Sequence, residues 1–295
     1  PFYYADLIAD TEIEFCLATQ DPQGNWTIGI TRTQTDINGI GMLSQVHYTN
    51  QGGRNAWAPN RYLNIWVADM GGGVGGRASF PGDEPLAEDG VVIDPLNFGT
   101  VGTAASSGPY NLGRTTTHEI GHYFNLEHVW GQGSPNCNNT DFVEDTPASS
   151  QTYLGECPEG DLVSCGSLEM YNNYMFYTND ACMAHFTPGQ KVRMLAAIQE
   201  YRSGLLTSSG CVLTAVGEQP FGAVTVYPNP ASDRLWVEGG GAINLYNLKG
   251  QLVRQQRAAP GEVFSVDVRA LPAGIYYLQV WKDEQTFTQT IIKQE

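Results

Sequence analysis

The sequence predicts an α+β domain, built from a twisted mixed sheet and a helix that carries metal ligands, followed by an all-β sandwich of the immunoglobulin type. Two observations indicate this order. Histidines with helical spacing follow short extended segments within the first 130 residues, and seven short apolar segments alternate with turn residues beyond residue 222. We therefore expect domains at residues 1–212 and 222–295, joined by a linker at 213–221.

Three segments of the first domain have the pattern of strands. Alternating apolar and polar side chains predict a half-buried strand over residues 10–19, and apolar runs predict buried strands over 62–68 and 90–94. Because the run at 90–94 precedes the histidines, we expect it at the upper rim of a cleft, where a peptide can add to its edge. An ordinary inner strand is the alternative.

The histidine pattern predicts a zinc site. His118 and His122 are four residues apart, so a helix places both imidazoles on one face. Glu119 lies beside the same ion and is free to act as a general base. His128 supplies a third imidazole once the chain has turned, and three neutral imidazoles leave the fourth tetrahedral position of a catalytic zinc open.

The zinc helix must end before His128. We expect it to begin after Asn111, a good N-cap, and to end near Phe124. Asn125 stands at the turn, and Asn tolerates the left-handed conformation better than any residue except Gly. The sequence therefore predicts a left-handed residue at position 125.

The segment 131–170 is rich in Gly, Pro, Asn and Cys and needs ties to stay ordered. The six cysteines, an even number, indicate disulfides and an oxidising compartment. A run of oxygen-bearing side chains is a candidate Ca²⁺ site. This run contains Asn138, Asn139, Thr140, Asp141, Glu144, Asp145 and Thr146.

A second helix follows at Thr187, which is expected to be its N-cap with Pro188 in the first turn. Its predicted apolar face comprises Val192, Met194, Leu195, Ile198 and Tyr201. The two remaining histidines, His47 and His185, are expected to have structural roles.

The net charge of −16 lies entirely before residue 222, because residues 222–295 contain seven basic and seven acidic side chains. Such a field opposes nucleic acid and anionic membranes as partners. No apolar run is long enough to span a membrane. The first residues, Pro-Phe-Tyr-Tyr, contain no initiator Met, which suggests a processed product.

With these motifs in view, residues 10–205 resemble the pappalysin family of metzincins, and within it the bacterial cytophagalysin branch. The shared elements are His118-Glu119-x-x-His122-x-x-Asn125-x-x-His128, Asp145-Thr146-Pro147, Asn173-Tyr174-Met175-x-Tyr177, Asp180-Ala181-Cys182-Met183 and Phe186-Thr187-Pro188-Gly189-Gln190. The family signature has Gly where this chain has Asn125. The resemblance implies a metzincin fold, with a twisted mixed sheet, an active-site helix and a lower subdomain that contains the Met-turn.

The resemblance also implies roles for individual residues. Met175 would be the Met-turn residue beneath the zinc ligands, and Tyr177 would bind the developing oxyanion. Structural Ca²⁺ would involve Asp141, Asp145 and Thr146. Asp180 would favour a basic residue after the cleaved bond. The implied disulfides are Cys137–Cys165 and Cys157–Cys182, which leaves Cys16–Cys211 as a remaining pair or Cys16 as a free thiol.

The C-terminal part has a resemblance of its own. Tyr227-Pro228-Asn229-Pro230, Asn247-Leu248-Lys249-Gly250-Gln251, Leu271-Pro272-Ala273-Gly274-Ile275 and the terminal Ile291-Ile292-Lys293 are similar to the C-terminal sorting domain of the type IX secretion system of Bacteroidetes. This implies export to the medium or the cell surface, with the secretion machinery as a partner. A carbohydrate-binding or surface-binding sandwich is the alternative.

Taken together, these observations lead us to expect a secreted monomer that hydrolyses proteins or peptides as a zinc metalloendopeptidase. An intact Glu119 favours this reading over a zinc-bearing but catalytically silent surface or adhesion protein. The sequence contains no evident clamp for a terminal charge, which disfavours an exopeptidase.

Overall fold

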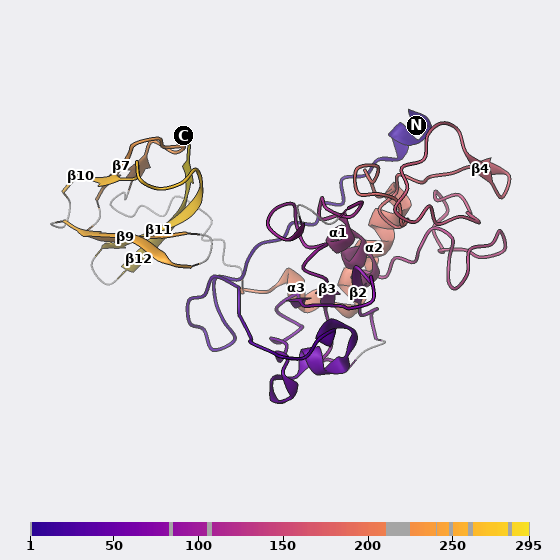
Figure 1. The fold of residues 1–295 in the computed structure, drawn as a ribbon, viewed down its shortest axis with the longest axis horizontal. Coiled ribbons are helices and arrows are strands. Elements are labelled where there is room, and N and C mark those ends of the chain that lie inside the picture. The colour runs from indigo at the N-terminus through magenta and orange to yellow at the C-terminus, as the bar shows by residue number, and fades with distance from the viewer. Residues whose placement is uncertain are drawn as a thin grey trace. The chain divides into compact units, whose positions relative to one another are not determined.

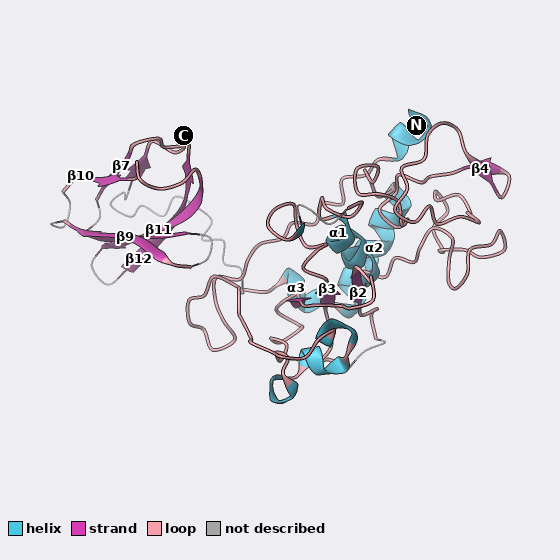
Figure 2. Ribbon diagram, in the orientation of Figure 1, coloured by secondary structure: helices cyan, strands magenta, loops and turns pink. Residues whose placement is uncertain are grey.

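The computed structural model describes residues 2–82, 85–104, 108–210, 225–239, 241–247, 250–258, 262–282 and 285–294. Contacts between Cα atoms divide the chain into two units, Pro1–Val212 and Leu213–Glu295. The first unit consists mainly of loops around short elements, whereas the second is built mainly from strands (Figure 1, Figure 2). The predicted linker at 213–221 lies outside the described residues.

The first unit is organised around a small mixed sheet. Its strands β1 (Ile65–Val67), β2 (Gly76–Ala78) and β3 (Val91–Ile93) have the order β1-β3-β2, with β1 parallel and β2 antiparallel to β3. All three residues of β3 are buried. The expectation that 90–94 forms the rim is therefore wrong, because β3 is the central strand and β1 and β2 are the edges.

Both faces of β3 are covered. Val91 and Ile93 belong to the same apolar cluster as Tyr123 at the end of helix α1 (Arg114–Tyr123), which lies against β2 and β3 (Figure 1). Val92 belongs to the opposite cluster with Trp66. That second face is covered by the short 3₁₀ helices η2 (Ile40–Met42) and η3 (Ser44–His47). Two further 3₁₀ helices are η1 (Phe2–Leu7) and η4 (Thr49–Gln51).

The strand predicted over residues 10–19 does not form. Phe15 and Leu17 are 57% and 56% exposed, and the segment has no strand assignment. The alternation suggested burial, but the segment has no sheet to join. It is attached at its ends instead, through the bridge between Ala9 and Phe186 and the bond from Thr19 N–H to Gly210 O.

Helix α2 (Pro188–Tyr201) begins as predicted. Thr187 is its N-cap, and Gln190 completes a capping box. The predicted apolar face is only partly correct, because Met194 and Ile198 are buried whereas Val192 is 68% exposed. A short helix α3 (Ser203–Leu206) follows it.

Disulfides tie the long segment after the zinc helix. Cys137 is bonded to Cys165, and Cys157 is bonded to Cys182. The first bridge reaches the hairpin of β4 (Val163–Ser164) and β5 (Ser167–Leu168). The expected partner of Cys16, Cys211, lies outside the described residues.

The second unit contains all seven predicted strands in two antiparallel sheets. One sheet has the order β10-β7-β6 and the other β12-β11-β8-β9. The strands are β6 (Thr225–Tyr227), β7 (Arg234–Glu238), β8 (Ala242–Asn247), β9 (Leu252–Arg257), β10 (Phe264–Asp267), β11 (Gly274–Lys282) and β12 (Gln285–Lys293). Residues of both sheets, such as Leu235 and Leu278, share one core, as in a sandwich.

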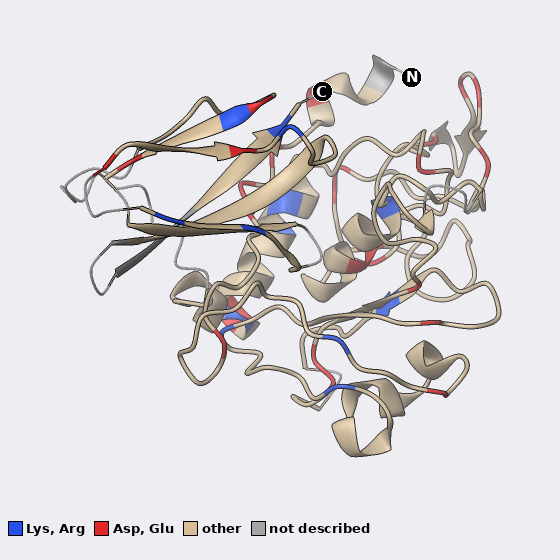
Figure 3. Cartoon of the chain, turned by 60° about the vertical axis from the view of Figure 1, so that its left-hand side comes forward, with Lys and Arg blue, Asp and Glu red and all other residues tan. Residues whose placement is uncertain are grey.

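Asp and Glu outnumber Lys and Arg in the sequence before residue 222 (Figure 3). Among the described residues, no helix is both long and apolar enough to cross a membrane.

A buried ion pair holds the end of α1 in place. Arg202 Nη1 lies 2.5 Å from Asp89 Oδ2, and Arg202 Nε donates to the carbonyl of Tyr123 at 3.1 Å. The guanidinium also covers the Tyr123 ring at 3.5 Å. Ser79, next to β2, donates its hydroxyl to Asp89 at 2.9 Å. The last turn of α1 is thus attached to both the sheet and the end of α2.

We expect Asp89→Asn to lower the free energy of unfolding of the first unit by about 3–5 kcal/mol, because it leaves the buried Arg202 guanidinium without its counter-charge. Urea unfolding of the full chain measures this loss. Glu12→Gln is the matched control. Its ion pair with Lys191 has side chains 69% and 22% exposed, and its loss should cost about 1 kcal/mol or less. Equal losses for the two variants would contradict the assignment.

Candidate metal centre

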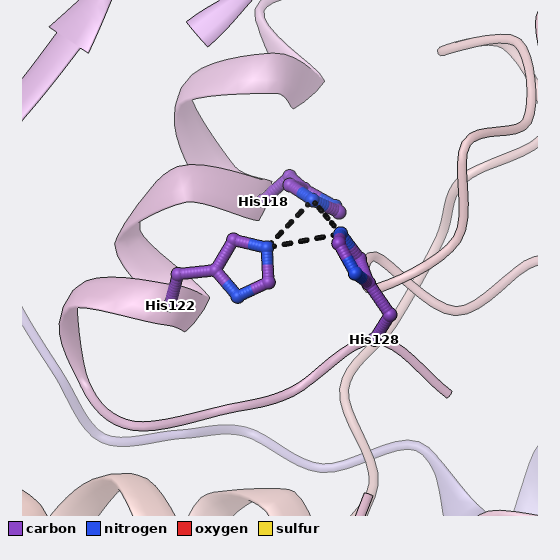
Figure 4. Close-up of side chains that lie close together, drawn as sticks. All are labelled: His118, His122 and His128. Atoms are coloured by element: carbon purple, nitrogen blue, oxygen red, sulfur yellow. Dashed lines mark hydrogen bonds between the residues drawn. The ribbon is translucent and has the colours of Figure 1, made fainter. Parts of the chain in front are cut away.

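The end of α1 sets the position of the third histidine. The helix ends at Tyr123, and Asn125 has a φ of 73°, which confirms the predicted left-handed residue. The chain then reverses, and Leu126 N–H donates to Gly121 O at 2.9 Å. His128 therefore returns toward the face of α1 that carries His118 and His122 (Figure 4).

The beginning of α1 differs from the prediction. The helix starts at Arg114 with Gly113 before it in a left-handed conformation, so Asn111 is not the N-cap. Asp180 supplies the missing acceptor from a distant segment. Its Oδ2 accepts the N–H groups of Leu112 at 2.7 Å and Arg114 at 3.1 Å. A carboxylate at this end also complements the helix dipole.

Three imidazole nitrogens converge on one point. The Nε2 atoms of His118, His122 and His128 are separated by 3.2, 3.1 and 3.1 Å (Figure 4). His118 Nδ1 lies 2.7 Å from the carbonyl oxygen of Tyr174, and His122 Nδ1 lies 2.7 Å from that of Leu126. A carbonyl only accepts, so each of these Nδ1 atoms carries the proton.

This arrangement fits a bound zinc ion. The Nε2 atoms of His118 and His122 keep lone pairs, and two lone pairs at 3.1 Å repel each other unless a cation lies between them. Tetrahedral ligands about 2.0 Å from zinc are about 3.3 Å from one another, close to the spacing observed here. Among the described residues, this is the one group of His, Cys, Asp and Glu with metal-binding geometry.

The surroundings keep the three rings neutral, as metal ligands must be. Burial lowers the pKa of His118 to about 3, assisted by the proximity of His122. Burial likewise lowers the pKa values of His122 and His128. The hydrogen bonds of His118 and His122 to backbone carbonyls also fix the directions of those rings.

Glu119 is enclosed beside this centre, with only 7% of its surface exposed. Burial raises the pKa of its carboxyl to about 8, and the charge of Arg77 acts in the opposite direction. Strand β2 lies directly over it. A Cβ atom at Gly76 would approach Glu119 Cγ to 2.8 Å and Oε1 to 3.1 Å.

Met175 lies under the helix. It is fully buried, and its Sδ atom is 2.5 Å from where a Cβ atom of Gly121 would be. Position 121 therefore accepts only Gly without a shift. The histidine motif leaves position 121 open, and the reason for a glycine there appears only when the distant Met175 is in place.

Comparison with known proteins assigns the family. Residues 47–199 match the peptidase M43 family, described as pregnancy-associated plasma protein-A. The chain belongs to the M43 family. An extracellular metalloprotease of Arthroderma benhamiae is 30% identical over 199 residues, which cover 66% of this chain and 66% of that relative. One of Pyricularia oryzae is 37% identical over 147 residues, covering 48% and 50%.

Solved structures agree with this assignment. Mature mirolysin of Tannerella forsythia, in complex with a cleaved peptide, is 42% identical with a TM-score of 0.62, covering 70% of this chain and 78% of that one. A promirolysin mutant of the same organism has a TM-score of 0.63 at 42% identity, covering 70% and 69%. The first unit thus has the metzincin fold of an M43 metalloprotease.

The second unit has its own match. Residues 225–294 correspond to a secretion system C-terminal sorting domain. Together with the likeness to a Tannerella protein, this identifies the chain as a secreted protein of the type IX system of Bacteroidetes.

Two aromatic rings, those of Tyr177 and Trp130, pack against the histidines of the M43 centre. The Tyr177 ring centroid is 4.8 Å from that of His128 and 5.5 Å from that of His118. Trp130 stacks on His128 with centroids 4.4 Å apart and ring planes 10° apart. Sequence reasoning missed Trp130, although its position two residues after His128 could have drawn attention to it.

The residues expected to bind calcium have hydrogen-bond partners within the protein. Asp141 Oδ2 accepts the hydroxyl of Thr146 at 2.6 Å. Asp145 is directed elsewhere, because its two oxygens accept Thr187 Oγ1 at 2.6 Å and Gly189 N–H at 2.7 Å, at the start of α2. A calcium site at Asp141, Asp145 and Thr146 stays a prediction.

We expect Gly121→Ala to destabilise the first unit by about 1–3 kcal/mol and to weaken zinc binding, because the new methyl group displaces Met175 from beneath the ligands. Urea unfolding and a zinc titration measure both effects. Met175→Ala removes the obstructing Sδ atom. The double variant should therefore lose less stability than the two single variants combined, and simple additivity would contradict the contact.

Proposed function

We propose that this chain is a zinc-dependent metalloendopeptidase that acts on proteins or peptides after secretion. One observation carries the proposal. Three Nε2 atoms lie 3.1–3.2 Å apart at the end of a helix on which Glu119 follows the first ligand. The names of the extracellular metalloproteases and of mirolysin support it, although this chain spans 66% of the length of the first such relative.

Glu119 is the proposed proton carrier. A bound zinc ion would polarise the scissile carbonyl and lower the pKa of its own water ligand to about 7. The Glu119 carboxylate takes the proton of the attacking water and delivers it to the leaving amine. Burial raises the pKa of Glu119, which suits the delivery step, while the charge of Arg77 favours the ionised form needed for the first step.

Tyr177 is the proposed oxyanion partner. Burial and the charge of Glu119 raise the pKa of its phenol to about 12, so the hydroxyl keeps its proton at neutral pH. It can therefore donate a hydrogen bond to the carbonyl oxygen as negative charge develops there. The Tyr177 carbonyl accepts hydrogen bonds from Gly155 N–H at 2.8 Å and from the Tyr110 hydroxyl at 2.9 Å, which hold its backbone.

The free edge of β2 supports cleavage within a chain. Asp94 N–H donates to Gly75 O, and Ser79 N–H donates to Gly90 O. By alternation, Gly76 and Ala78 direct their backbone groups away from β3. Such an edge pairs with the backbone of an extended peptide without engaging its termini, which supports an endopeptidase over an exopeptidase.

The expected preference for a basic residue after the cleaved bond is not part of the proposal. Asp180 is 1% exposed, and its Oδ2 atom is committed to the beginning of α1. Calcium is also left out, because Asp141 and Asp145 engage different partners. A zinc-bearing but silent surface protein stays the alternative, and Glu119 argues against it because a purely structural zinc needs no buried carboxylate beside it.

We expect Glu119→Gln to retain zinc and to lower kcat/KM by about 10²–10⁴, because Gln cannot accept the proton. Hydrolysis of a fluorogenic peptide and the zinc content of the purified protein test this. Glu127→Gln is the control. That residue accepts a hydrogen bond from Gln132 in the same stretch and should keep its activity. Near wild-type turnover by Glu119→Gln would contradict the role of Glu119 as the general base.

Metal removal should abolish hydrolysis and lower the melting temperature of the first unit, because the Nε2 lone pairs then face one another without a cation. One equivalent of zinc should restore both properties. Activity and calorimetry before and after dialysis against 1,10-phenanthroline provide the measurement. His122→Ala should prevent the recovery, and hydrolysis that persists in the chelated protein would refute zinc chemistry.

A further inference from the structure

Strand β2 covers Glu119 although it is a short strand at the edge of the sheet. It has three residues and lies at the edge of the sheet, paired on one side with β3. The close approach of the Gly76 backbone to Glu119 Cγ and Oε1 leaves no room for a side chain. A small displacement of β2 would therefore change the space available to the carboxylate.

The side chain of Arg77 lies on the opposite face of this strand. Arg77 pairs with Val92 of β3, and paired residues on neighbouring strands share a face of the sheet. Val92 belongs to the cluster with Trp66 and Met70, on the face away from α1. Arg77 is thus directed toward η2 and η3, while Gly76 faces Glu119.

Arg77 connects β2 to both of these short helices. Its Nη2 atom donates to His47 Nε2 at 2.8 Å, and its Nε atom donates to the Gly41 carbonyl at 3.2 Å. His47 is 1% exposed and is edge-on to the Trp66 ring at 4.4 Å. Burial and the charge of Arg77 lower the pKa of His47 to about 4, so its ring is neutral at physiological pH and accepts the bond.

The partners of Arg77 are unusual for a partly buried arginine. Within the described parts of the chain, no carboxylate lies within ion-pair distance of it. Its bonds go to a neutral ring and a backbone carbonyl. The guanidinium therefore fixes geometry through directed bonds, and its charge also lowers the pKa of Glu119 without forming an ion pair with it.

We propose that His47 and Arg77 are positioning residues for Glu119, because they hold β2 in the place where its backbone encloses the carboxylate. This inference rests on the proposed function of Glu119, but the seating of β2 is a separate physical claim. It assigns a catalytic consequence to His47, which the sequence alone suggested to be purely structural.

The first experiment tests the seating of β2 independently of activity. Hydrogen–deuterium exchange of the full chain is compared between wild type and Arg77→Met, which keeps side-chain length without the donors. We expect faster exchange over residues 75–79 and unchanged exchange over α2. Arg61→Met is the control, because Arg61 bonds to Ser209 and covers Tyr62. Unchanged exchange over 75–79 in Arg77→Met would overturn the proposal.

The second experiment tests the consequence for Glu119. Arg77→Met and His47→Leu should each lower kcat on a short peptide by up to about 100-fold, the effect of misplacing a catalytic group by about 1 Å, with zinc content nearly unchanged. His47→Gln retains an acceptor and should recover most of the rate. The double variant should be no slower than the slower single variant.

The outcomes separate the two claims. A loss of melting temperature with kcat unchanged would show that the pair is only structural, which overturns the positioning role. Independent, additive losses for His47→Leu and Arg77→Met would overturn their action as a pair. If wild type itself does not cleave peptides, the proposed function fails, and the exchange experiment alone decides whether Arg77 seats β2.

Discussion

The convergence of three imidazole Nε2 atoms, two of which carry lone pairs, is the constraint on which the rest of the first unit depends. The lone pairs of His118 and His122, whose Nε2 atoms are 3.1 Å apart, repel each other without a cation, so the protein must hold these rings together by other means. It does so with backbone carbonyls. Tyr174 and Leu126 accept the Nδ1 protons of His118 and His122, and these carbonyls come from the segment before Met175 and from the turn after Asn125. The energy of metal binding is thereby linked to two loops that are far apart in sequence.

Helix α1 is only ten residues long, too short to be stable alone, and tertiary contacts support both of its ends. Asp180 accepts the free N–H groups at its beginning, and Arg202 donates to the Tyr123 carbonyl at its end. The disulfide from Cys157 to Cys182 closes the segment that carries Asp180. This bridge is therefore connected to the metal centre through the helix whose beginning Asp180 caps.

What could be predicted from sequence depended on whether the decisive contact was local. The capping box of α2, the left-handed Asn125 and the seven strands of the sandwich follow from residues within a few positions of one another. The failures involve distant partners. Residues 10–19 alternate like a strand but have no sheet to join. Strand β3 is central and not at the rim because β2 pairs with the side of β3 that β1 leaves open. In the site, the spacing of the histidines predicts the metal ligands. The roles of Gly121, Trp130 and Arg77 depend on contacts with residues distant in the chain or on the folded turn, so the sequence does not predict them.

The same reasoning applies to Asp145 and Asp180, for which the sequence predicts roles as a metal ligand and a substrate-binding residue. Acidic side chains near an active-site sequence attract functional interpretations, yet each of these two caps the beginning of a helix. A loop-rich domain has few regular hydrogen bonds with which to satisfy its helix ends, so carboxylates from distant loops supply them. In this chain the acidic composition of the first unit therefore has a structural use besides solubility, because two of its carboxylates hold the beginnings of α1 and α2.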